Sequence, residues 1–200
     1  FQAGDWDAVA ELLSDDISND DRRRVVNAGM ERGRDNQLAN LRHLAGIKAT
    51  VSSAVIATRG QHLLLSRVGT LNSDLGNGEF DSEMLVVIET DSDGRIAAGV
   101  LFDGDTLGNA FAELDARYLA GEAADYADTW SIIKRNTDAF NRRELPAATP
   151  DWVNVDHRRT TSFAPGNLSA YLRAAWDLAP QVTIYVEAVH RLSNFGAVVT

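Results

Sequence analysis

The sequence predicts an α+β fold in which helices come first in the chain and then pack on an antiparallel sheet. Stretches with apolar residues at helical spacing precede runs that are rich in Val, Ile and Thr. Turn signals, above all Asp-Ser-Asp-Gly at 91–94, divide those runs into hairpins. The order of helix, helix and hairpin then recurs in the second half of the chain. The sequence therefore predicts one fold in tandem, with the second copy incomplete.

The tandem pattern divides the chain near residue 120. Residues 1–120 are expected to form a first domain whose first helix is truncated, and residues 121–200 to begin a second domain that lacks its later strands. Residues 54–66 align with residues 188–200 without a gap, although few residues are identical. A period above a hundred residues indicates two domains and not a solenoid of short repeats. We expect the chain to be a segment of a longer protein.

The first copy contains each of these elements in turn. Trp6, Val9, Leu12 and Leu13 keep helical spacing, and Leu38–Ala45 does so again after Gly33. Between the helices, Glu11–Asp21 is rich in carboxylates but lacks the spacing and central glycine of a calcium loop, so we expect a solvated loop.

Two predicted hairpins and a closing helix follow. The first hairpin pairs Lys48–Ala57 with His62–Thr70 around a turn at 58–61, and the second pairs Phe80–Thr90 with Arg95–Phe102. The closing helix, Asp105–Leu119, has an apolar face. In the second copy, helices are predicted at 130–144 and 168–178, before another hairpin.

Composition restricts the classes of function. The 200 residues carry a formal net charge of −10, which disfavours contact with nucleic acid. There is no apolar run near the ~20 residues that span a bilayer, so no membrane contact is expected. The absence of cysteine fits a cytoplasmic location, and four scattered histidines do not suggest a metal site. No cofactor is expected. Lysine occurs only at positions 48 and 134, a bias typical of high-GC bacterial genomes.

Several short motifs resemble those of the SnoaL-like, or nuclear transport factor two-like, superfamily. They are Phe1-Gln2-Ala3-Gly4-Asp5-Trp6, Ile56-Ala57-Thr58-Arg59-Gly60, Gly94-Arg95-Ile96 before Leu101-Phe102-Asp103, and, in the second copy, Ala139-Phe140-Asn141-Arg142-Arg143 and Val155-Asp156-His157-Arg158-Arg159. More narrowly, the chain resembles the tandem SnoaL-like repeats of large actinobacterial multidomain proteins. The resemblance implies a cone-shaped, curved antiparallel sheet packed with helices.

The resemblance also implies a pocket between helices and sheet. Enzymes of the superfamily, of the ketosteroid isomerase, polyketide cyclase and epoxide hydrolase types, use a carboxylate there. Burial raises the pKa of a carboxylate and makes it suitable for moving protons near neutral pH. Glu83 and Arg67 are the candidates in the first copy, because each is a charged residue within a strand-like run. They either face the pocket or lie on the solvent face of the sheet.

Two acidic–arginine clusters are further candidate binding sites. Asp21-Arg22 and Asp156-His157-Arg158 are interpreted either as ligand-binding groups, with His157 as a general base, or as ion-paired structural corners. His190 aligns with an isoleucine of the first copy, so it is either part of a packed wall or a catalyst found in one copy alone.

The sequence thus leaves two functions open. The first is a non-catalytic accessory module of a larger bacterial regulatory protein, which binds a small molecule or another protein. The second is a SnoaL-like enzyme acting on a hydrophobic small molecule. The absence of a charged constellation shared by both copies favours the first. Expected partners are a hydrophobic small molecule, a protein or upstream domains of the same polypeptide. Pairing of the copies as a pseudo-dimer, or assembly as a homo-oligomer, is also expected.

Overall fold

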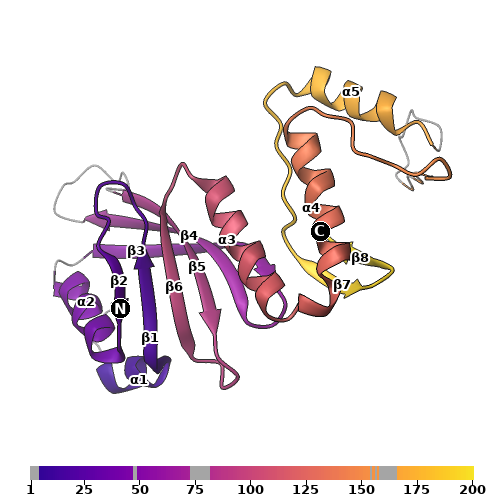
Figure 1. Ribbon diagram of the computed structural model, residues 1–200. Helices are drawn as coiled ribbons and strands as arrows, with labels where there is room; N and C mark the ends of the chain where they lie inside the picture. The colour runs from indigo at the N-terminus through magenta and orange to yellow at the C-terminus, as the bar shows by residue number, and fades with distance from the viewer. Residues whose placement is uncertain (1–4, 47–48, 73–81, 154, 156, 158–165) are drawn as a thin grey trace.

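The computed structural model describes residues 5–46, 49–72, 82–153, 155, 157 and 166–200 (Figure 1). Helices and strands form separate groups along the chain, as expected for an α+β fold. The elements are α1 Trp6–Glu11, β1 Leu13–Asp21, β2 Gly29–Arg32, α2 Arg34–Gly46, β3 Ala49–Arg59, β4 Leu63–Asn72, β5 Ser82–Thr90, β6 Ile96–Asp103, α3 Leu107–Ala120, a 3-10 turn Ala124–Tyr126, α4 Ala127–Asn141, α5 Leu168–Leu178, β7 Val189–Ser193 and β8 Gly196–Val199.

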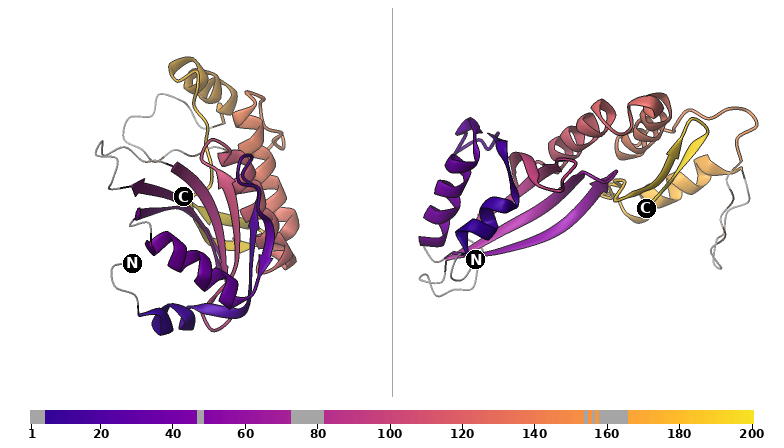
Figure 2. Two further views of the ribbon diagram at one scale, coloured as in Figure 1. Left: turned by 90° about the vertical axis from the view of Figure 1, so that its left-hand side faces the viewer. Right: turned by 90° about the horizontal axis from the view of Figure 1, so that it is seen from below.

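A six-stranded sheet forms the larger part of the fold, with strand order β2-β1-β6-β5-β4-β3. Both predicted hairpins of the first copy are confirmed as the antiparallel pairs β3–β4 and β5–β6. The sheet curves, and the helix α3 lies along one side of it, with α4 continuing beyond the ends of the strands toward β7 and β8 (Figure 2, right). The predicted α+β class, with a curved sheet that is mostly antiparallel and is packed with helices, is confirmed.

The expected solvated loop at 11–21 is wrong, and the sheet has two strands more than the two predicted hairpins provide. This segment forms β1, which pairs parallel with β6 and antiparallel with the short edge strand β2. Buried positions in β1 are Leu13, Ser14, Ile17 and Asp21, which do not alternate, and the register shifts between Leu13 and Ser18. This irregularity hides the alternation that identifies a half-buried strand in a sequence.

The main hydrophobic core lies between the sheet and the helix α3. Alternate residues of the central strands face it, among them Leu65, Leu85 and Val100, each 0% exposed. The helix α3 contributes Ala110, Phe111, Leu114 and Tyr118, the face predicted from its spacing. A smaller core joins Leu13 and Ile17 of β1 to Leu38 of α2.

The C-terminal part of the chain contributes to this main core. Trp130 of α4 is 1% exposed within it, and Val186, Val189 and Leu192 pack against it. An extended run around Glu187 lies against the end of β3, where the Thr58 amide donates to the Glu187 carbonyl at 2.8 Å. Residues on both sides of position 120 therefore share one core, and the division of the chain into two domains there stays a prediction.

The hairpin β7–β8 occupies the place that the alignment gives it in the second half. Its strands pair antiparallel and meet in a turn after Ser193, just as β3 and β4 meet after Arg59. None of the helices in the described part of the chain is both long enough and apolar enough to cross a lipid bilayer.

Candidate functional site

Three consecutive arginines follow β1, and each of them pairs with at least one carboxylate. Arg22 donates to Asp20 of β1 at 2.6 Å and to Glu113 of α3 at 2.9 Å. Arg24 donates to Asp103, the last residue of β6, and to Asp105, each at 2.8 Å. The arginines lie beside β6 because the backbone of Arg22 continues the hydrogen bonding between β1 and β6. The Arg22 amide donates to the carbonyl of Leu101 at 3.0 Å.

A pocket of about 450 Å³ opens beside these arginines. We call it the arginine pocket, and its lining consists of Arg22, Arg24, Phe102, Asp103, Thr106, Asn109, Ala112 and Glu113. The Arg22 guanidinium lies 5.6 Å from the centre of the Phe102 ring, within the range of a cation–π contact. The pocket thus combines an aromatic wall with two cations and two carboxylates.

Charged side chains at the pocket form a chain of ion pairs. Glu113 receives hydrogen bonds from both Arg22 and Arg117, and Arg117 continues to Glu89 of β5 at 2.5 Å. Burial alone would raise the pKa of Glu113, but the hydrogen bonds from Arg117 and Arg22 outweigh it, so its pKa lies below the ordinary value. The Glu113 carboxylate therefore stays charged at neutral pH and does not act as a proton donor.

Asp21, predicted as a ligand-binding residue beside Arg22, is not among the residues that line the arginine pocket. Its carboxylate accepts from the Arg23 side chain at 2.7 and 3.0 Å and from the Arg23 amide at 3.0 Å. Asp21 is only 7% exposed, so this arrangement is the ion-paired corner that was the alternative interpretation. The hydrogen bond from the Arg23 side chain is the main reason that the pKa of Asp21 is lowered.

This shift gives a pH-dependent prediction. Because the folded-state pKa of Asp21 lies below its ordinary value of 3.8, the carboxylate stabilises the fold above that pH. Asp21→Asn should lower stability at about pH 7 and above, and the difference from wild type should shrink as the pH falls through the folded-state pKa. Urea unfolding between about pH 3 and pH 7 measures this. The control is Asp15→Asn, which alters a carboxylate that is 84% exposed. A difference that grows on acidification would contradict the prediction.

Glu83 and Arg67 do form a pair, on the neighbouring strands β5 and β4. Strand register places both on the face that carries Leu65 and Leu85, so they are not on the outer face of the sheet. They nevertheless lie beyond the part covered by α3, and their side chains are 44% and 43% exposed. The pair is an open, charge-compensated ion pair at the end of the inner face.

The remaining predicted residues are dispersed. His157 is exposed between α4 and α5, and His190, exposed on β7, pairs through Nε2 with Thr200 Oγ1 at 2.6 Å. Asp156 and Arg158 lie outside the described residues. No hydrogen bond or ion pair joins Glu83, His157 and His190 in the described part of the chain. Within that part, no cluster of three or more acidic, histidine or cysteine side chains could hold a metal ion.

A buried charged network was missed by sequence reasoning. Arg59, expected in an exposed turn, ends β3 and is 1% exposed, and its Nε donates to Asp115 of α3 at 2.9 Å. The guanidinium lies 5.0 Å from the ring of Trp130 and 5.9 Å from that of Phe111. Burial raises the pKa of Asp115, and Arg59 opposes that shift.

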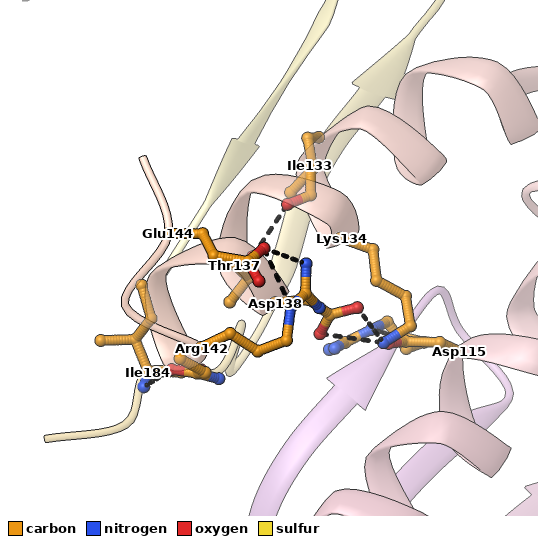
Figure 3. Close-up of polar contacts among 10 residues, drawn as sticks. Asp115, Ile133, Lys134, Thr137, Asp138, Arg142, Glu144 and Ile184 are labelled. Carbon is orange, nitrogen blue, oxygen red and sulfur yellow. Dashed lines mark hydrogen bonds and ion pairs between the residues drawn. The ribbon is translucent and has the colours of Figure 1, made fainter. Parts of the chain in front are cut away.

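The network continues into α4. Lys134 lies between two carboxylates, with its Nζ 3.9 Å from Asp115 and 3.2 Å from Asp138 (Figure 3). Further along α4, the Asn141 side chain makes reciprocal hydrogen bonds with the backbone of Ile184, at 2.8 and 2.9 Å. These contacts attach α4 to α3 through Lys134 and to the segment before β7 through Asn141.

Similarity to known proteins is found among solved structures. No protein-family model matches the sequence, and no curated protein matches it either. Among solved structures, the chain is similar to an NTF2-like protein with a cystatin-like fold from Novosphingobium aromaticivorans, with 16% identity over 55% of this chain and 76% of that one and a TM-score of 0.41. It is also similar to an NTF2-like protein of unknown function from Exiguobacterium, with 18% identity over 50% and 84% and a TM-score of 0.38.

A third similar structure is a candidate isomerase of the SnoaL-like family from Agrobacterium tumefaciens. Its identity with this chain is 13%, over 49% of this chain and 79% of that one, with a TM-score of 0.40. These solved proteins are of the SnoaL-like and NTF2-like kinds that the sequence resembles.

Proposed function

We propose that the chain is a non-catalytic binding module, an accessory part of a larger bacterial regulatory protein, and that the arginine pocket is where it recognises its ligand. The observation that carries the proposal is the distribution of charge. Among the described residues, the buried Arg59 and Asp115 pair with each other, whereas the two arginines of the pocket, although also ion-paired, are 44% and 68% exposed and line it together with an aromatic ring.

Acid–base catalysis would need a titratable group that faces a cavity and can reach a substrate. Asp115 has the raised pKa that such a group needs, but Arg59 occupies its carboxylate and aromatic rings cover Arg59. Glu83 reaches solvent, but Arg67 neutralises it. Asp115 is closed off from a substrate, and Glu83 is paired with Arg67, which favours binding over turnover.

The pocket suggests the chemistry of the ligand. Arg24 is 68% exposed, and a solvent-exposed ion pair such as Arg24–Asp105 contributes little to stability. Arg24 can therefore exchange its carboxylate partner for one on a ligand at little cost. Phe102 lines the pocket and is 5% exposed, so it offers a small apolar contact beside the arginines. An aromatic or alicyclic carboxylate fits both features, whether it is a free small molecule or a side chain of a partner protein.

The binding test uses phenylacetate and its neutral amide, phenylacetamide, as probes. In protein-observed NMR we expect saturable shifts of pocket residues with the carboxylate and weaker shifts with the amide. Arg24→Ala should reduce the affinity about two- to fivefold, because it removes the guanidinium that pairs with the carboxylate and an ion pair at an exposed arginine is weak. Arg142→Ala is the matched control, since Arg142 pairs with Glu144 at similar exposure away from the pocket. Equal loss in both variants, or no saturable shift, would contradict this site.

A separate turnover test distinguishes binding from catalysis. We expect no turnover by the wild-type chain on isomerase, cyclase or epoxide substrates. Glu83→Gln keeps the shape of the side chain but cannot transfer a proton, so it should leave folding and phenylacetate binding unchanged. Turnover that Glu83→Gln abolishes would overturn the non-catalytic proposal in favour of a SnoaL-like enzyme. Turnover that survives the substitution would also overturn it and would direct attention to His157 and His190.

A further inference from the structure

The two edges of the six-stranded sheet differ in length and charge. The edge strand β2 has four residues, two of which, Glu31 and Arg32, are charged. Short, charged edge strands are a common protection against pairing with another chain. The opposite edge strand, β3, has eleven residues, and its first ten, 49–58, include no charged residue, glycine or proline. Over residues 49–55 the edge formed by β3 thus lacks protection by charge or proline, and the irregularity in its register, between Val55 and Ala57, lies at the end of this stretch.

Much of this edge is uncovered. Residues 50–55 are all exposed, which means that neither face of this part of β3 is covered by a helix. The residues are Thr, Val, Ser, Ser, Ala and Val, small or β-branched types that suit a strand. Val51 and Val55 are 45% and 61% exposed. Exposed apolar side chains on an unprotected edge mark a surface that pairs with another strand.

The same edge already pairs at its other end. The Thr58 amide donates to the Glu187 carbonyl at 2.8 Å, so an extended segment of the chain lies against the C-terminal end of β3. Residues 50–55 continue that edge without such a partner among the hydrogen bonds of the described residues. The backbone of β3 is therefore in the right conformation to accept a strand along residues 50–55.

We propose that the partner is a second copy of this chain, and that the two β3 strands pair antiparallel about a two-fold axis at Ser53. In this arrangement residue 52 lies opposite residue 54 of the other copy. Val51 lies opposite Val55 of the other copy, because antiparallel pairing about residue 53 matches positions whose numbers add to twice 53. The two exposed valines of each chain then meet the two of the other in cross-strand pairs.

Self-pairing also fits the charges. Each copy carries a net charge of −10, which opposes association in general. A two-fold axis places a strand against itself, so any charged residue near the axis would meet a like charge. Residues 49–58 have none, and the carboxylates of the chain lie elsewhere. Pairing along residues 49–58 of β3 therefore brings two acidic chains together without placing like charges opposite each other in the paired strands.

The first test is the oligomeric state. Sedimentation equilibrium of the wild-type chain over a range of concentrations should show a monomer–dimer equilibrium. Val51→Lys should raise the dissociation constant at least tenfold, because it places a cation on the paired edge. Met30→Lys is the matched control: Met30 is 54% exposed on the edge strand β2, and this substitution should leave the constant within about twofold. Circular dichroism confirms that each variant is folded.

The second test determines the register in which the two β3 strands pair. The chain has no cysteine, so an introduced one can form a disulfide only with another copy. Ser53→Cys lies on the axis and should cross-link rapidly in mild oxidant, whereas Thr50→Cys, three residues away, should remain mostly reduced. Wild type that is monomeric at every concentration would overturn the proposal. A dimer weakened equally by Val51→Lys and Met30→Lys, or equal cross-linking at both positions, would also overturn it.

Discussion

Replacing Arg59 by methionine is expected to lower the free energy of unfolding by about 3–5 kcal/mol. Methionine preserves the length and the apolar part of the side chain, but it leaves Asp115 buried, at 6% exposure, without its main partner. Lys134 is 3.9 Å from the same carboxylate and compensates it only in part. Urea unfolding followed by circular dichroism measures the loss.

The control for this prediction removes both charges. In Arg59→Met/Asp115→Leu no buried charge is left unpaired, and replacing a buried ion pair by apolar residues is often neutral. The double variant should therefore recover to within about 1 kcal/mol of wild type. If it is as unstable as Arg59→Met, the cost arises from lost packing around the guanidinium and not from an uncompensated charge.

The destabilisation by Arg59→Met should also depend on pH. Burial already raises the pKa of Asp115, and removing Arg59 removes the main opposing effect. A carboxyl whose folded-state pKa exceeds the unfolded value destabilises the fold as the pH rises between the two. Arg59→Met should therefore be less destabilising at about pH 4–5 than at about pH 8.

Trp130→Ala is expected to destabilise the protein by about 3–5 kcal/mol, the range for removing a large aromatic side chain from a core. Trp130 is 1% exposed and meets Tyr118 of α3 edge-on, with ring centres 5.6 Å apart. The Trp130 ring also lies 5.0 Å from the buried guanidinium of Arg59. Since Trp130 belongs to α4, its loss should weaken the attachment of the C-terminal part to the first sheet as well.

The matched control is Trp152→Ala, which removes the same side chain from a site that is 37% exposed. A partly exposed substitution of this kind is expected to change the unfolding free energy by about 0.5–1 kcal/mol. Thermal and urea unfolding of both variants provide the comparison. A small effect of Trp130→Ala would mean that α4 folds independently of the sheet, which is the outcome that a strict domain boundary at residue 120 predicts.

The sequence by itself determined the elements whose signals are local. The turn at 91–94 forms because Gly94 adopts a φ of 79° and the Asp91 side chain accepts from the amides of residues 93 and 95. The face of α3 followed from the 3.6-residue period of its apolar positions. In both cases the cause lies within a few residues, which is why the α+β class and the two hairpins could be predicted.

The strand β1 and the environment of Arg59 were decided only by tertiary structure. The parallel partner of β1 is β6, and four strands and the helix α2 lie between them in the chain. No local sequence pattern marks such a distant pair. Arg59 is buried because Asp115, 56 residues later, and Trp130, on another helix, surround it. A charge can be buried only where a distant partner compensates it, so its local sequence, a charged residue before a glycine, indicates an exposed turn. Likewise, Arg22 and Arg24 are held at the pocket by a carboxylate on α3 and one at the end of β6. These contacts form only when the chain folds.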